Sequence, residues 1–184
     1  MDPPFLDPLI RVPTLVPAAY RPLPPGTPHI QPVPPATPSD PRFPPLTPSQ
    51  GQNFQTWLDS LRKGDISGDR PAEQAYQRRV SGFPEFEVPI PAGVSPSNTL
   101  MVDGFRNLDG ATARWKTSAR TTRPATETYK DDRLELRKYA AALNDPRNKE
   151  MRGVETVTNN QDAVQYWRIM MAAYGVKGHA RYVP

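Results

Sequence analysis

Residues 105–124 concentrate side chains that could contact a phosphate backbone. Five cations, a tryptophan and several hydroxyl groups share this stretch with a single acid, Asp109. A flexible basic segment with an aromatic side chain can follow a nucleic acid backbone and stack a base. The same pattern fits a basic loop that docks onto an acidic protein surface, so both contacts stay open. The candidate residues are Arg106, Arg114, Trp115, Lys116, Arg120 and Arg123.

Few side chains in the sequence are suited to nucleophilic catalysis. Such catalysis usually needs a base beside the nucleophile, and the two histidines, His29 and His179, lie in a proline-rich segment and near the C-terminus. Asp131, Asp132 and Glu135 form an acidic cluster, but the lysines and arginines among them indicate a solvated face of mixed charge. Glycine-rich phosphate-binding fingerprints are missing from the sequence. We therefore predict a protein that is not an enzyme, with no catalytic residues and no cofactor.

Composition and charge exclude further classes of protein. The chain of 184 residues has a formal net charge of +4 and contains no cysteine, which excludes disulfides, thiolate catalysis and cysteine-based metal sites. No metal site is predicted. The N-terminus lacks the basic and apolar regions of a signal peptide, and the longest nearly apolar run, residues 169–176, is too short to span a bilayer. We expect a protein of a virion or a cytoplasmic complex that does not span a membrane.

A repeat with a period of ten residues occupies much of residues 1–48. The pattern apolar-Pro-Pro-x-Thr-Pro begins at positions 23, 33 and 43, and 17 of the 25 prolines lie in residues 1–48. Proline fixes φ and removes a backbone donor, which excludes helix and central strand and favours an extended polyproline II arm. Apolar residues between prolines are typical of anchors that dock into a partner. The expected anchors are Phe5, Leu23, Val33 and Phe43 in the arm and Trp57 and Trp167 in the remaining chain.

Residues 49–184 are predicted to form a small helical body. Apolar side chains recur at helical spacing in residues 50–64, 126–144 and 159–174, and a shorter helix is expected from Pro71 to about Val80. Residues 82–125 are expected to be an extended middle region, in which Asp-Gly steps at 103–104 and 109–110 favour turns. Residues 176–184 form a short C-terminal tail. The predicted fold class is mainly α, with long irregular segments, a polyproline II arm and at most a short β-ribbon.

This combination of arm, small body, extended middle and tail is typical of chains that gain order from their neighbours in large assemblies. We therefore predict a non-enzymatic structural or assembly subunit, above all a minor virion protein of a bacterial virus (capsid cement, head–tail or internal protein). Its partners would be other protein subunits of the assembly, with nucleic acid as a further contact. Two alternatives stay open. One is a proline-rich adaptor, because residues 22–25 match the PxxP pattern that SH3 or WW domains bind. The other is a basic accessory protein for nucleic acid packaging.

Overall fold

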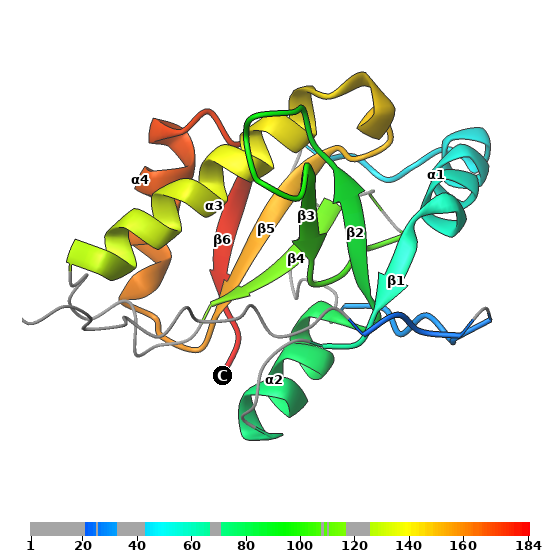
Figure 1. Ribbon diagram of the computed structural model, residues 1–184. Coiled ribbons are helices and arrows are strands. Elements are labelled where there is room, and N and C mark those ends of the chain that lie inside the picture. Colours follow the sequence, from blue (N-terminus) through cyan, green and yellow to red (C-terminus); the bar gives the residue numbers. More distant parts are fainter. Residues whose placement is uncertain are drawn as a thin grey trace, which may run out of the picture.

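The computed structural model describes residues 21–24, 26–32, 43–66, 71–107, 109, 111–116 and 126–184, of which residues 112–116 and 126–129 are described by their backbone alone. Within these ranges, four α-helices and a short 3-10 helix are combined with two three-stranded sheets (Figure 1). The protein is a mixed α/β fold. The predicted fold class, mainly α with at most a short β-ribbon, is therefore wrong.

The first sheet is antiparallel, and its middle strand is β2. Its strands are β1 (Arg62–Gly64), β2 (Glu85–Pro89) and β3 (Thr99–Val102). Phe86 lies opposite Val102, and both belong to the main apolar core. Residues 90–98 connect β2 to β3, so the chain does not turn between them at the predicted Asp-Gly steps. The step at 103–104 instead follows the end of β3.

The second sheet is parallel, and its middle strand is β5. Its strands are β4 (Ala111–Lys116), β5 (Gly153–Thr158) and β6 (Gly178–Tyr182). All residues of β5 are buried, as expected for a strand that is covered on both faces. Parallel strands need crossover connections. These are α3 with the 3-10 helix η2 (Pro146–Asn148) between β4 and β5, and α4 between β5 and β6.

The α-helices lie in the regions where helices were predicted. They are α1 (Pro48–Ser60), α2 (Pro71–Ser81), α3 (Thr126–Asn144) and α4 (Ala163–Ala173). α3 has the predicted bounds, whereas α1 and α4 are shorter than predicted. α1 is capped by Thr47 of the third proline-rich repeat, because the Thr47 side chain accepts from the Gln50 N–H and the Gln50 carboxamide accepts from the Thr47 N–H. None of the helices in the described ranges is long and apolar enough to cross a membrane.

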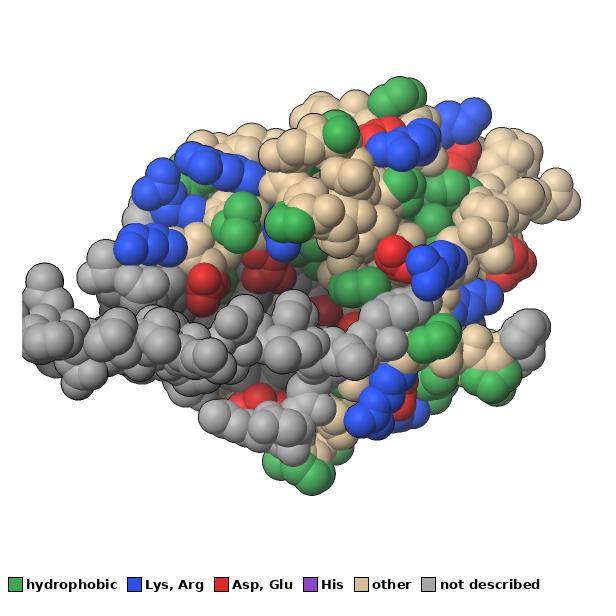
Figure 2. Space-filling model, in the orientation of Figure 1, with side chains coloured by type: hydrophobic (Ala, Val, Ile, Leu, Met, Phe, Trp, Pro, Cys, Tyr) green, Lys and Arg blue, Asp and Glu red, His purple; other side chains and the backbone are tan. Residues whose placement is uncertain are grey.

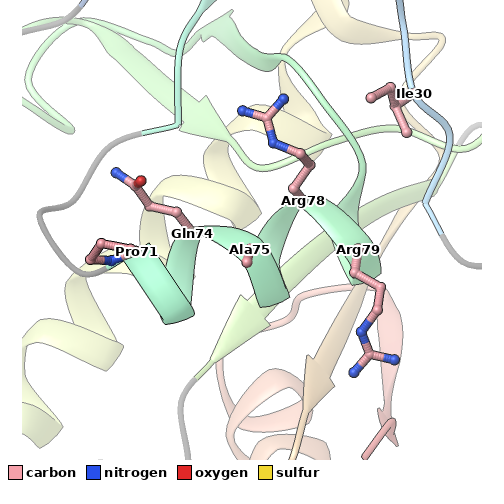
Figure 3. Close-up of a pocket in the computed structure, with 6 residues that line it drawn as sticks. All are labelled: Ile30, Pro71, Gln74, Ala75, Arg78 and Arg79. Atoms are coloured by element: carbon pink, nitrogen blue, oxygen red, sulfur yellow. The ribbon is translucent and has the colours of Figure 1, made fainter.

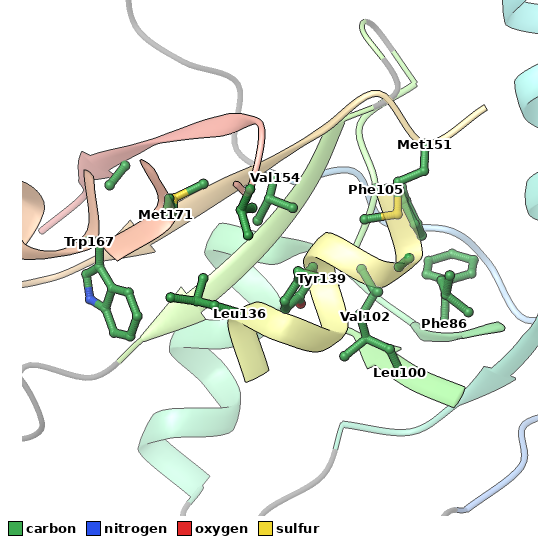
Figure 4. Packing of buried hydrophobic residues seen from close by; sticks show 14 of the residues in the cluster. Phe86, Leu100, Val102, Phe105, Leu136, Tyr139, Met151, Val154, Trp167 and Met171 are labelled. Carbon is green, nitrogen blue, oxygen red and sulfur yellow. The ribbon is translucent and has the colours of Figure 1, made fainter. Parts of the chain in front are cut away.

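The two faces of the parallel sheet bury different apolar clusters. On one face, Trp167 of α4 and Leu136 of α3 pack in the main core with Val154 of β5 (Figure 4). On the other face, Val80 of α2 packs with Val157 of β5. Residues on opposite faces of β5 thus pack against α2 on one side of the sheet and against α3 and α4 on the other side.

The described part of the proline-rich segment lies against this chain's own sheet. The Leu23 N–H donates to the Lys63 carbonyl in β1 at 3.1 Å. Ile30 and Phe83 exchange two backbone hydrogen bonds of 2.7 and 3.0 Å just before β2. The segment is therefore attached along the edge of the body at residues 21–32.

Candidate active site

Two carboxylates lie at the end of the antiparallel sheet where β2 begins and β3 ends. The paired register ends at Phe86 and Val102, and Glu85 and Asp103 lie one position beyond this pair on their two strands, at the same end of the sheet. Glu85 is only 2% exposed, and Asp103 is half-buried. One end of the first sheet therefore carries two neighbouring acidic side chains.

Gln77 of α2 holds Glu85 in place. Its carboxamide Nε2 donates to Glu85 Oε1 at 2.7 Å, and both side chains are buried. Val80, three residues further along α2, is anchored in the cluster with Val157 of β5, which fixes the position of the helix. Carboxylates that bind metal ions are commonly oriented by such hydrogen bonds from a neighbouring side chain.

Gly104, the residue after Asp103, packs closely against the end of α2. A Cβ atom on Gly104 would lie 1.7 Å from the backbone oxygen of Ser81, the last residue of the helix. A residue with a side chain cannot occupy this position unless the backbone moves. α2, the start of β2 and the end of β3 therefore form one tightly packed unit around the carboxylates.

Acidic side chains are visible between α3 and α2 in Figure 2. Mg²⁺ usually binds one or two protein carboxylates and keeps its other positions for water and substrate phosphate. Across the described ranges, no group of three or more His, Cys, Asp or Glu side chains could hold a metal ion. Two carboxylates such as Glu85 and Asp103 match the number that an open Mg²⁺ site uses, in which water and substrate supply the other ligands.

A second cluster of charges lies buried on the parallel sheet. Arg106 donates through Nε and Nη2 to the two carboxylate oxygens of Asp109 at 3.2 and 2.8 Å, and through Nη1 to Glu155 Oε2 at 2.6 Å. His179 Nε2 is hydrogen-bonded to Glu155 Oε1 at 2.7 Å, and Arg181 Nε lies 2.9 Å from the same oxygen. The network joins the segment after β3 to β5 and β6.

The electrostatics of this network are dominated by the cations around Glu155. Burial by itself would raise the pKa of Glu155, but the hydrogen bond from His179 and the charges of Arg106 and Arg181 lower this pKa to about 2. Burial would likewise lower the pKa of Arg106, but the charge of Glu155 and the hydrogen bonds to Asp109 and Glu155 raise it. Glu155 is therefore ionised at neutral pH, and both of its oxygens are engaged by cationic side chains.

The predicted basic segment is divided between different environments. Arg106 is buried in the network around Glu155. Residues 114–116 lie in β4, where the register places them beside residues 156–158 of β5. Arg120 and Arg123 lie outside the described residues. Contact of this segment with nucleic acid or an acidic protein stays a prediction.

The predicted anchors also occupy different positions. Phe43 and Trp167 are 1% and 0% exposed, so in this structure they fill the interior of their own chain. Trp57 and Leu23 are half-buried, and the other two predicted anchors, at positions 5 and 33, lie outside the described residues. Anchoring to a partner stays a prediction for this set.

Sequence reasoning overlooked Glu85 and interpreted Asp103 as a turn residue. A local signal was present, because Glu85 begins a strand with alternating apolar residues and Asp103 directly follows the apolar residues 100–102. The acidic cluster is not a solvated face throughout, since Asp132 is fully buried and accepts a hydrogen bond from Tyr166 at 3.2 Å. His179 was expected in a free tail, but β6 orients it toward the carboxylate of β5.

Residues 72–177, more than half of the chain, match the model of a family described as restriction endonuclease fold toxin 2. The chain belongs to this family. The match begins in α2 and contains both Glu85 and Asp103. Comparisons with the curated proteins and with the solved structures gave no match.

Family membership corrects the predicted function. A toxin with the fold of a restriction endonuclease is not a structural subunit of a bacterial virus, so the prediction of a minor virion protein is wrong. The prediction failed because the arm and body describe an architecture, and architecture alone does not specify chemistry. The family also weighs against the expectation that the chain is not an enzyme. The expected partners and localisation stay predictions.

Proposed function

We propose that this protein is a toxin nuclease that hydrolyses phosphodiester bonds of nucleic acid at Glu85 and Asp103. The observation that carries the proposal is the register of β2 and β3, which places the two carboxylates at the same end of the sheet. Both residues lie in the region that matches the restriction endonuclease fold toxin family. The hydrogen bond from Gln77 supports the proposal, because it orients a buried carboxylate without neutralising it.

Hydrolysis of a phosphodiester consumes one water molecule and needs no oxidant or reductant. The water oxygen forms a bond to phosphorus, the bond to one sugar oxygen breaks, and that oxygen takes up a proton. A divalent cation bound at the site would stabilise the charge on the phosphoryl oxygens and lower the pKa of its bound water. Glu85 and Asp103 are the residues that would hold the cation, and Gln77 fixes the orientation of Glu85.

The network around Glu155 has a supporting role in this proposal. A carboxylate with a pKa of about 2 is a poor proton donor and a weak base at neutral pH. Its hydrogen bond to Arg106 instead holds the segment that follows Asp103. The position of Asp103 thus depends on the close packing of Gly104, the next residue, and on the ion pairs of Arg106, three residues after Asp103.

The test is cleavage of DNA and RNA by the purified protein with Mg²⁺ or with EDTA. We expect Asp103→Asn and Glu85→Gln to lower the rate by at least about 10- to 100-fold, the loss that follows mutation of residues that merely orient metal ligands. Asp162→Asn and Glu150→Gln make the same exchanges at positions away from the two carboxylates and should retain the activity. Melting curves verify that all variants fold.

Two outcomes would overturn the proposal. The first is cleavage at the wild-type rate by both Asp103→Asn and Glu85→Gln. The second is a folded wild-type protein that leaves DNA and RNA intact in the presence of Mg²⁺.

A further inference from the structure

A pocket of about 550 Å³ lies between α2 and the proline-rich segment (Figure 3). It is bordered on one side by the backbone pair of Ile30 and Phe83, which precedes β2. Figure 3 shows Arg78 and Ile30 on one side of the helix, whereas the Arg79 side chain points toward the other side. The lining residues are Ile30, Pro71, Gln74, Ala75, Arg78 and Arg79.

Both arginines of the pocket are held by aromatic rings. The guanidinium carbon of Arg78 lies 4.2 Å from the centroid of the Phe83 ring, and that of Arg79 lies 4.9 Å from the centroid of Tyr76. Arg79 also donates to the carbonyl of Pro184. In the part of the chain that the structure describes, no Asp or Glu side chain forms an ion pair with Arg78. The stacked guanidinium of Arg78 keeps its planar set of donors for an external anion.

We propose that this pocket binds a phosphate of the nucleic acid strand that is cleaved at Glu85 and Asp103. Phosphate matches the guanidinium groups in charge and in the geometry of its oxygens. The apolar surface of Ile30, Pro71 and Ala75 offers contact area for a sugar or a base. This inference rests on the proposed function.

The pocket also lies close to the proposed active site. Phe83, under the guanidinium of Arg78, is two residues before Glu85 in the sequence. Gln77, which holds Glu85, directly precedes Arg78 in α2. The same two elements, α2 and the segment that leads into β2, thus carry both Arg78 of the pocket and the residues that hold Glu85.

The central test adds a negative charge to the pocket. Ala75 is exposed and lines the pocket, so Ala75→Glu removes no packed side chain and is compatible with a helix. The matched control is Ala172→Glu, which makes the same exchange at an exposed position of α4, across the parallel sheet from α2. Binding is measured with short fluorescein-labelled single strands of DNA and RNA by anisotropy. EDTA is present, so that binding is observed without hydrolysis.

We expect Ala75→Glu to weaken binding by about tenfold or more, because like charges brought together in an interface are strongly unfavourable. Ala172→Glu should bind nearly as the wild type does.

Arg78→Gln should reduce the slope of log K against log salt by about 0.7, the contribution of one phosphate contact on a single strand. Arg168→Gln, at an exposed position of α4, should leave the slope unchanged. Arg78→Lys keeps the charge without the planar fork and should bind between the wild type and Arg78→Gln.

The outcomes separate this inference from the proposed function. Equal binding by Ala75→Glu and Ala172→Glu, with an unchanged slope for Arg78→Gln, overturns the pocket even if the protein is a nuclease. Weak binding by folded Ala75→Glu supports the pocket, even if cleavage proves not to depend on Glu85 and Asp103. A wild-type protein that binds neither strand overturns the pocket.

Discussion

Removal of the charge of Glu155 should destabilise the whole fold. Glu155 is fully buried between Arg106, His179 and Arg181, and Arg106 is itself buried. Glu155→Gln removes the negative charge that these side chains face, and loss of one member of a buried ion pair costs about 3–5 kcal/mol. A typical domain is stable by only about 5–15 kcal/mol. The variant should therefore unfold at a much lower temperature or denaturant concentration.

The pH dependence of stability gives an independent measure of the same effect. The pKa of Glu155 is about 2 in the folded chain against an ordinary value of 4.5, which corresponds to roughly 3 kcal/mol of stability. Because the folded pKa is lowered, this stability is present above 4.5 and is lost as the pH falls from there through about 2. The two routes give similar magnitudes for one side chain.

The assay is urea unfolding of the wild type and Glu155→Gln at a series of pH values. The wild type should lose stability on acidification, and the difference between the two proteins should shrink as Glu155 becomes protonated. Glu150→Gln makes the same exchange outside the network and should follow the wild type. If Glu155→Gln is as stable as the wild type at neutral pH, or if the gap does not change with pH, the reasoning is refuted.

Two further substitutions test other parts of the structure. Gly104→Ala should lower both the melting temperature and any nuclease activity, because the new Cβ would lie 1.7 Å from Ser81 O. Gly51→Ala is the control and should lower neither, because a Cβ at that position meets nothing within 4 Å. Equal melting temperatures for the two variants would contradict the close contact at Gly104. Burial and the nearby charge of Lys63 lower the pKa of His29, so its stabilising contribution should be lost as the pH falls below 6.5. In His29→Phe this part of the acid destabilisation should be missing, as followed by thermal melting, and an unchanged pH profile would show that His29 does not titrate with folding.

Local patterns in the sequence were sufficient to find the helices. The stripe of Leu136, Ala140 and Leu143 and the terminating Asn144-Asp145-Pro146 predicted α3 at its observed bounds. These signals depend on residues three or four positions apart, which are neighbours in any helix. The predicted start of the first helix at residue 50 was two residues late, because Thr47 and Pro48 belong to the third proline-rich repeat.

The sheets were harder to predict, because their pairing is not local. β5 is buried on both faces and lacks the polar–apolar alternation that marks a half-exposed strand. Its neighbours β4 and β6 are separated from it by helices. Glu155 is isolated among apolar and hydroxyl residues in the sequence, and its partner Arg106 lies 49 positions away.

Local sequence patterns predicted which segments are helical, because helix formation depends on the backbone preferences of residues that are close together in the chain. Only the tertiary structure decided where the charges lie. The antiparallel pairing of β2 and β3 brought Glu85 and Asp103 to the same end of the sheet, and the parallel sheet placed cations beside Glu155. Both arrangements arise from strand pairing, which joins residues far apart in the sequence through backbone hydrogen bonds. No local sequence pattern indicates which strands will pair.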